Sequence, residues 1–234
     1  QIGIAYGIAV AELFQPIDFI IHIHNGSVHP GNHVFAQPGY NRTGILRSAA
    51  CVDFSTGLEI PHSDVPVHKV AFYPGSSIGN FDPDDAVRLL ADVGSMVGPG
   101  GHLLIGVDLK KPVGLLHAAY NDAAGVTAAF NLNLLRRIRS ELDTDLDPDN
   151  FAHYAFYSPL AGRIEMHLIS NVRHRVRIED RTFAIEPGEG IQTENSYKYT
   201  AESFAGLAAC GGWHSEAEWR DPDGLFSLYG LKAR

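Results

Sequence analysis

The apolar positions along the chain show two spacings in turn, one typical of strands and one typical of helices. Residues 67–73 are largely apolar and run into a loop of small residues at 74–80, as a buried strand does. Asp82, as an N-cap residue, and Pro83, at the first helical position, then open a helix with one apolar face. A glycine-rich stop follows, and residues 102–109 read as a second apolar strand. Strand, helix and strand in this order predict a βαβ unit in a parallel, doubly wound sheet.

The second half of the chain mixes helical and strand spacing. The expected helices lie at 115–142, from 147 onward and, behind Thr200 as N-cap, at 201–210. The expected strands lie at 163–169, 172–178 and 183–185, with a final edge strand at 226–231. We therefore expect an antiparallel patch that interrupts an α/β sheet.

The first 50 residues follow neither spacing clearly. Residues 17–23 fit a strand, and Asn-Gly and Pro-Gly pairs mark turns between residues 25 and 44. The segment contains four charged residues: Glu12, Asp18, Arg42 and Arg47. The chain begins at Gln1 without a recognisable signal peptide, and we expect it to be the remainder of a longer chain.

Composition narrows the class of protein. Of the 234 residues, 45% are hydrophobic and 19% are charged, as in a soluble globular protein with one large domain or two small ones. The net charge of −9 argues against a nucleic-acid or anionic-lipid partner. No apolar run reaches the length of about 18 residues that a membrane span needs. Cys51 and Cys210 are too few for a disulfide framework, so we expect two buried thiols and a cytoplasmic location.

Candidate binding residues follow the expected parallel strands. In a doubly wound sheet, ligands bind beyond the carboxyl ends of the strands, where Asp53, Phe54, the loop 74–80 and Asp108 would meet. The glycines of the loop let its backbone approach a ligand, and Asn80 offers a donor and an acceptor. An ordinary strand-to-helix connection explains the same glycines. No phosphate-cradling Gly-x-x-x-x-Gly-Lys-Ser/Thr motif is present in the sequence, which argues against an NTPase.

A polar and aromatic run at residues 193–199 lies between an expected strand and an expected helix. If this run is extended, Glu194 and Ser196 point to the same side, about 7 Å apart. A carboxylate and a hydroxyl at that distance can bracket a small ring that carries two nitrogens. Composition alone favours a simpler interpretation, a charged loop with an incidental capping threonine.

Other polar side chains suggest no chemistry of their own. We interpret three of them as helix-surface or helix-capping polarity: Asp122, Asn131 and Asn133. Four histidines gather near the amino end: His22, His24, His29 and His33. Their spacing fits no closed metal site, and no acidic or thiolate residues complement it, so we expect no bound metal.

Six segments in fixed order carry a resemblance to a known family. They are residues 72–81 (FYPGSSIGNF), 106–111 (GVDLKK), 119–131 (AYNDAAGVTAAFN), 163–168 (RIEMHL), 193–199 (TENSYKY) and 219–226 (WRDPDGLF). Over about residues 51–234 the chain closely resembles the histidine-specific methyltransferase family, the L-histidine Nα-methyltransferases of ergothioneine biosynthesis.

The resemblance implies an α/β fold: a Rossmann-like S-adenosylmethionine methyltransferase sheet with an inserted α+β substrate-binding domain. Residues 1–110 and 201–234 would form the methyltransferase domain, and residues 111–200 the substrate-binding domain. The implied enzyme is a monomer that methylates the α-amino group of L-histidine, its small-molecule substrate, up to the trimethyl betaine, hercynine. S-adenosyl-L-methionine is the implied co-substrate, without a metal.

The resemblance also implies roles for single residues at the substrate. Asn80 and Tyr120 match positions that hold the carboxylate and amine end of histidine. Glu194 and Ser196 match the pair on the imidazole, and Met166 matches a wall of the pocket. The sequence names no general base, so the catalytic residues stay unassigned.

At the co-substrate, Asp53 and Phe54 match contacts to the adenine, and Asp18 resembles the aspartate that takes the ribose. The family has further residues at its amino end, with a substrate-contacting tyrosine and a glycine-rich loop after the first strand, and residues 19–50 match neither. We therefore expect a sheet that lacks its first strand and exposes an edge. Three functions remain open: a histidine methyltransferase, a methyltransferase for another amino acid, and an inactive or merely histidine-binding truncated homologue.

Overall fold

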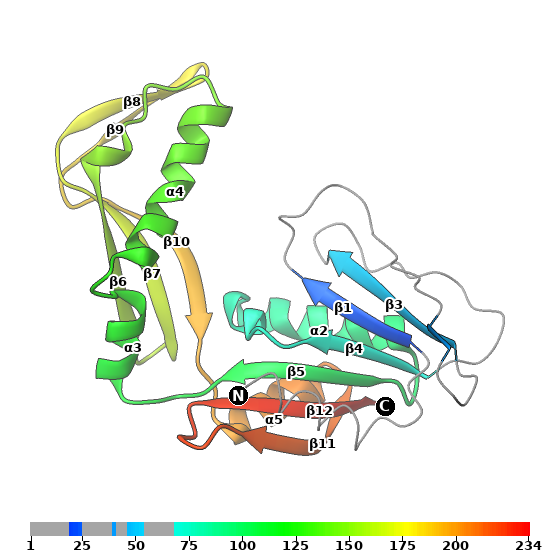
Figure 1. Cartoon of the computed structure of the whole chain (residues 1–234). Helices are drawn as coiled ribbons and strands as arrows, with labels where there is room; N and C mark the ends of the chain where they lie inside the picture. The colour runs from blue at the N-terminus through cyan, green and yellow to red at the C-terminus, as the bar shows by residue number, and fades with distance from the viewer. Residues whose placement is uncertain (1–18, 25–38, 41–45, 54–67) are drawn as a thin grey trace. The chain divides into compact units, whose positions relative to one another are not determined.

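The structure is a computed structural model that describes residues 19–24, 39–40, 46–53 and 68–234. The chain divides into two compact units, Gln1–Leu109 with Tyr199–Arg234, and Lys110–Lys198. Figure 1 shows their elements. The second unit interrupts the first in the sequence, close to the expected boundaries at 110/111 and 200/201, and the assignment of the two units as domains stays a prediction.

A seven-stranded sheet forms the first unit, in the order β11-β12-β5-β4-β1-β3-β2 (Figure 1). The strands are β1 (Phe19–His24), β2 (Gly39–Tyr40), β3 (Leu46–Asp53), β4 (Lys69–Tyr73), β5 (His102–Asp108), β11 (Trp213–Arg220) and β12 (Phe226–Ala233). Strands β3, β1, β4 and β5 run parallel to one another, and β2, β12 and β11 pair antiparallel with their neighbours. Helix α2 (Pro83–Val97) packs on β4, and α5 (Ala201–Cys210) packs on β11. The predicted α/β class with a Rossmann-like sheet is confirmed.

The predicted βαβ unit is confirmed in β4, α2 and β5, since β4 and β5 are parallel and adjacent. Its core consists of apolar side chains from α2, such as Leu90 and Val93, and from β5, such as Leu104 and Ile105. The predicted N-cap of α5 is also confirmed. Thr200 Oγ1 accepts a hydrogen bond from the Ser203 N–H at 3.2 Å, and Ser203 Oγ accepts one from the Thr200 N–H at 2.9 Å.

The prediction that residues 226–231 form the final edge strand is wrong. Strand β12 lies between β5 and β11, and most of its side chains are buried. Burial of consecutive residues means that both faces of β12 are covered, and its pairing with β5 and β11 places a strand along each of its edges. The edge is β11 instead, where buried or half-buried residues alternate with exposed ones and the exposed set is charged or polar.

The expectation of a sheet without its first strand is also wrong. Strand β1 lies between β3 and β4, with Phe19 opposite Ser48 on one side and Lys69 on the other. Its sequence, FIIHIH, has the apolar and β-branched residues that a strand inside a sheet favours. The parallel sheet therefore continues past β4 instead of ending there.

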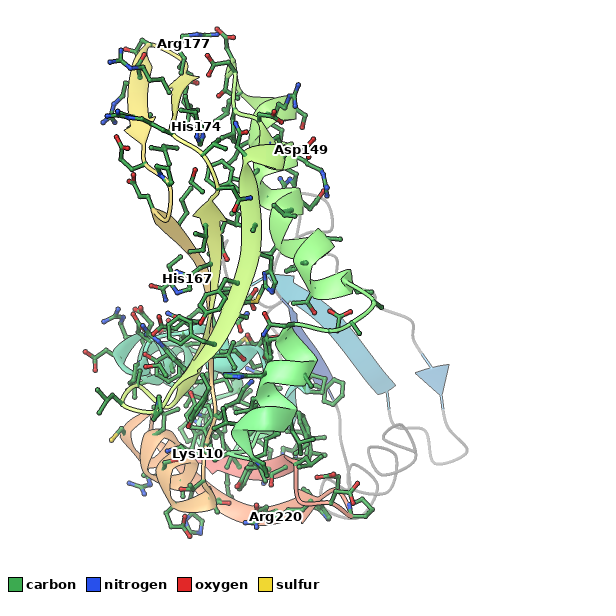
Figure 2. The ribbon with its side chains drawn as sticks, turned by 90° about the vertical axis from the view of Figure 1, so that its left-hand side faces the viewer. Lys110, Asp149, His167, His174, Arg177 and Arg220 are labelled. Atoms are coloured by element: carbon green, nitrogen blue, oxygen red, sulfur yellow. The ribbon has the colours of Figure 1, made fainter. Side chains whose placement is uncertain are left out.

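The second unit places two helices on an antiparallel sheet. Its elements are α3 (Val113–Tyr120), α4 (Val126–Glu141), the short 3₁₀ helix η2 (Pro148–Asn150), β6 (Phe151–Ser158), β7 (Arg163–Ser170), β8 (His174–Ile178), β9 (Arg181–Ile185) and β10 (Gly190–Tyr197). Strands β10, β7 and β6 form a three-stranded sheet, and β8 and β9 form a hairpin. In Figure 2, Lys110 lies at one end of this unit and Arg177 lies on the hairpin at the other.

The two helix predictions in this unit have different outcomes. Residues 115–142, predicted to be mostly helical, form the two helices α3 and α4. Between them, the Asn121 side chain hydrogen-bonds both backbone groups of Ala155 on β6, at 3.0 and 3.2 Å. The helix expected from residue 147 is only the single turn of η2, followed by β6. Asp147 does cap that turn, but residues from Phe151 onward pair with β7, and this tertiary pairing overrides the local helix signal.

Asp122 caps the second of these helices, which confirms the capping interpretation of this residue. Its carboxylate accepts hydrogen bonds from the backbone N–H groups of Val126 and Thr127 at 2.9 and 2.8 Å. These bonds, chiefly the one from Thr127, lower the pKa of Asp122 to about 2 from its usual 3.8. The charged carboxylate is therefore the form that stabilises the start of α4.

Replacing Asp122 by asparagine should make the stability of the protein less sensitive to acid. A carboxylate whose pKa is lower in the folded state stabilises the fold above its unfolded pKa, and this contribution is lost as the pH falls through the folded pKa. Between about pH 4 and pH 2, the wild type should thus lose more stability than Asp122→Asn, as measured by urea unfolding. Asp92→Asn, on the exposed surface of α2, is the control. Equal losses in the wild type and Asp122→Asn would contradict the capping role.

Candidate functional site

The carboxyl ends of the parallel strands carry the first set of candidate residues. Asp53 is the last residue of β3 and lies opposite His24, the last residue of β1. Asp108 ends β5 at the same edge of the sheet. The loop 74–80 follows β4, which runs parallel to β1 and β5, so Asp53, this loop and Asp108 lie at one edge of the first unit, as predicted. Phe54 and Asp18 lie outside the described residues, so their roles stay predictions.

The loop after β4 is held firmly against β5. The backbone N–H of Asp108 donates a hydrogen bond to Ser76 Oγ at 2.8 Å, and Ser76 adopts a left-handed backbone with φ of 58°. A Cβ at Gly106 would overlap the carbonyl oxygen of Pro74, which explains why glycine stands there. The loop ends in the 3₁₀ helix η1 (Ser77–Asn80), where the last residue, Asn80, is exposed. The amide of Asn80 is therefore presented from a backbone that is fixed at both ends.

The second set of candidate residues lies on one face of β10 in the second unit. Glu194, Ser196 and Lys198 alternate along this strand and its continuation, so their side chains share a face. Met166 on β7 lies opposite Glu194, and its side chain is buried. The run at 193–199, read from the sequence as lying between a strand and a helix, is therefore largely the end of strand β10.

Tyr120, the last residue of α3, closes this face over the strand. Its hydroxyl donates a hydrogen bond to Ser196 Oγ at 2.8 Å. The Lys198 ammonium donates to the hydroxyl oxygens of Tyr120 and Ser196, at 2.9 and 2.8 Å, and lies 4.9 Å from the centre of the Tyr120 ring. The structure thus gathers Tyr120, Met166, Glu194 and Ser196 in one unit, and we call this group with Lys198 the β10 cluster. The Tyr120 hydroxyl lies at Ser196, the residue expected at the imidazole, and the roles of all these residues stay predictions.

The β10 cluster contains a carboxyl and an amino group, those of Glu194 and Lys198, that are largely shielded from solvent. Burial raises the pKa of the Glu194 carboxyl, while the positive charge of Lys198 lowers it. Ser196 and Lys198 are only 8% and 3% exposed to solvent. A ligand that reaches Glu194 therefore meets a carboxylate with little competing water, where a hydrogen bond counts for more than at the surface.

A partly buried chain of hydrogen bonds holds the backbone of Tyr120. His153 Nε2 donates to the Tyr120 carbonyl at 2.8 Å, and Asn131 Nδ2 donates to His153 Nδ1 at 3.0 Å and to the His167 carbonyl at 3.1 Å. The prediction of surface or capping polarity for Asn131 is wrong, because this residue is 4% exposed and ties α4 to β6 and β7. Asn133, two residues on, is exposed as expected.

Sequence reasoning did not single out Lys198. A lysine near a turn is ordinarily read as a solvated side chain, yet its nitrogen bonds a tyrosine 78 residues away in the sequence. The signal that would have found it is the alternation itself, since Lys198 continues the spacing of Glu194 and Ser196.

Other expectations concern metals, membranes and thiols. Among the described residues, no three His, Cys, Asp or Glu side chains are grouped so as to hold a metal ion. His22 and His24 belong to β1, whereas His29 and His33 lie outside the described residues. Within the described part of the chain, no helix is both long and apolar enough to span a membrane. The expectation of a buried thiol is wrong for Cys210, which is exposed as the last residue of α5.

Comparison with known proteins assigns the chain to a family. The family described as "Histidine-specific methyltransferase, SAM-dependent" matches residues 40–233. The chain belongs to this family. The match covers both units and includes Asp53, Asn80 and the β10 cluster.

Individual relatives agree with the family. One relative is the histidine N-alpha-methyltransferase of Mycolicibacterium smegmatis. It is 37% identical to this chain, over 82% of this chain and 60% of that protein. The protein of the same name from Mycobacterium tuberculosis is 37% identical over 80% of this chain and 58% of its own length. The chain thus spans only 60% and 58% of the length of these two relatives. Among solved structures, the CcbJ methyltransferase from Streptomyces caelestis aligns with a TM-score of 0.46 at 11% identity, over 97% of this chain and 93% of that one.

Proposed function

We propose that this protein transfers a methyl group from S-adenosylmethionine to the α-amino group of L-histidine and repeats the step to the trimethyl betaine, hercynine, in ergothioneine biosynthesis. The observation that carries the proposal is that half-buried Glu194 and buried Ser196 share one face of β10 in a chain of the histidine-specific family. The names of the mycobacterial relatives support the same substrate. We further propose that the protein works as a cytoplasmic monomer.

The substrate ring is the part of histidine that the β10 cluster recognises. The Glu194 carboxylate accepts the ring N–H, the Ser196 hydroxyl bonds the second ring nitrogen, and Met166 lies against the ring as an apolar wall. An apolar analogue without ring nitrogens would leave both polar side chains unpaired, at a cost of about 1–3 kcal/mol each. Substrate choice would therefore rest on Glu194 and Ser196.

The co-substrate fits the edge of the first unit where β1 and β3 end. Asp53 stands at that edge, where doubly wound sheets bind nucleoside-containing ligands, and would hold the adenine with Phe54, while Asp18 would hold the ribose. When bound, S-adenosylmethionine supplies a methyl group on a positively charged sulfur, and the carbon–sulfur bond breaks as the carbon–nitrogen bond forms. The nitrogen needs a free lone pair at each transfer, so the ammonium form of L-histidine gives up one proton before each of the three methyl transfers. Asn80 and Tyr120 would aim the amine, so that positioning supplies most of the catalysis.

The test is product analysis by mass spectrometry after the purified protein is incubated with S-adenosylmethionine and each protein amino acid in turn. The proposal requires products of L-histidine with one, two and three added methyl groups. A product from another amino acid alone would instead support the second methyltransferase function. Binding of L-histidine and of S-adenosylhomocysteine without any product would support the histidine-binding homologue.

A further inference from the structure

The ammonium group of Lys198 is enclosed by the β10 cluster. Lys198 is 3% exposed and lies between two hydroxyl groups, at 2.9 Å from Tyr120 Oη and 2.8 Å from Ser196 Oγ. Enclosing a charged amine costs free energy unless hydrogen bonds and charge compensate it. The ring face of Tyr120, at 4.9 Å, and the carboxylate of Glu194 provide part of that compensation. The position of this charge is thus defined on several sides.

The enclosed ammonium also sets the direction of the hydrogen bonds around it. An ammonium donates and never accepts, so the oxygens of Tyr120 and Ser196 each accept one bond from Lys198. Between the two hydroxyls, 2.8 Å apart, the phenol is the stronger acid and donates to Ser196. Ser196 Oγ then accepts two bonds, which use both of its lone pairs. Among the described residues these are its only side-chain partners, so its own O–H remains to donate to a ligand.

We propose that Lys198 is a positioning residue that fixes Ser196 as a hydrogen-bond donor, so that the Glu194–Ser196 pair binds neutral imidazole in one tautomer and rejects imidazolium. The inference rests on the proposed function, that the site takes L-histidine. Neutral imidazole has one N–H for Glu194 and one bare nitrogen for Ser196. Imidazolium has two N–H groups, and one of them would face the Ser196 O–H.

Few other titratable groups face this part of the second unit. Strand β10 contributes Glu194 and Lys198, α3 contributes Tyr120, and β6 contributes His153 and Tyr157. The side chains of β7 on the same face are apolar: Ile164, Met166 and Leu168. His153 accepts from Asn131 and donates to the Tyr120 carbonyl, so both ring nitrogens are bonded within the second unit. This residue is unchanged in every variant below.

The test compares the pH dependence of L-histidine binding in the wild type and in Lys198→Met, by calorimetric titration. With a free imidazole pKa of about 6.5, wild-type affinity should fall about tenfold between pH 7.5 and pH 5.5. Without Lys198 the Ser196 hydroxyl can turn and accept, so imidazolium binds between Glu194 and Ser196. The affinity of Lys198→Met should therefore fall less than about threefold over the same range.

A second variant and a control for folding complete the experiment. Lys198→Arg keeps a cationic donor and should restore the tenfold fall, while thermal melting shows which variants are folded. A flat wild-type profile would overturn the inference without any variant, and so would an unchanged tenfold fall in folded Lys198→Met. A folded Lys198→Arg as flat as Lys198→Met would overturn the role of the cation. A wild type that fails to bind L-histidine even at pH 7.5 would overturn the proposed function as well.

Discussion

Replacing Glu194 by alanine is expected to weaken L-histidine binding about 10- to 150-fold. The carboxylate is half-buried on the face it shares with Ser196, where the ring N–H would lose a charge-assisted hydrogen bond worth about 1.5–3 kcal/mol. Binding of S-adenosylhomocysteine should change little, because the residues assigned to the co-substrate belong to the first unit. Isothermal titration of the same protein with each ligand measures both effects.

A pair of matched substitutions separates a local effect from a general one. Glu194→Gln and Glu165→Gln make the same chemical change on adjacent strands of one sheet, but Glu165 points to the opposite face, where it pairs with Arg163 at 2.9 Å. Only Glu194→Gln should weaken histidine binding. Equal losses of histidine and S-adenosylhomocysteine binding in Glu194→Ala would count against the assignment of this site.

Replacing Trp213 by alanine is expected to lower the free energy of unfolding by about 3–5 kcal/mol. This side chain is 1% exposed, its Nε1–H donates to the Leu90 carbonyl at 2.8 Å, and its ring lies against Gly94 of α2. The substitution leaves a large cavity between β11 and α2 and removes the indole bond to the Leu90 carbonyl. Against a typical total stability of about 5–15 kcal/mol, much of the folded population would be lost at moderate temperature. Urea unfolding followed by circular dichroism measures the change.

The chain provides a matched control, since its two tryptophans both lie on β11. Trp219 is only half-buried, so Trp219→Ala should cost clearly less than Trp213→Ala. Trp213→Phe keeps most of the ring volume and should recover more than half of the loss. If Trp213→Ala and Trp219→Ala were equally destabilised, the burial of Trp213 would not explain the loss of stability.

The sequence predicted the fold best where local signals and tertiary packing agree. The strand β4, the capped helix α2 and the strand β5 carry apolar spacing, an N-cap and a glycine stop that all favour the same βαβ unit. Prediction failed where pairing decides the structure. The helix signal at Asp147 is overridden by the pairing of β6 with β7. The position of β12 inside the sheet depends on its pairing with β11, a strand that was not predicted from the sequence.

The candidate site was predictable only in part, for the same reason. Alternation along a strand relates Glu194 to Ser196 from the sequence alone. No local pattern relates Ser196 to Tyr120, which is 76 residues earlier, or reveals that Asn131 lies on the buried face of α4. Such contacts are set by how α3 and α4 pack on the sheet, so they require the tertiary structure. Family resemblance supplied Tyr120 and Met166 as candidates, and it did not supply Lys198.

The form of strand β11 bears on how the protein behaves at high concentration. An unpaired sheet edge invites strand addition by a second copy, which leads to aggregates. Here the edge strand has an irregular register between Ser215 and Ala217, and Glu216, Glu218 and Arg220 are exposed along it. A bulge interrupts the row of hydrogen-bonding groups that a second copy would have to extend. Strand β11 therefore has two roles: it places Trp213 in the core, and its irregular edge opposes the addition of strands that leads to fibrils.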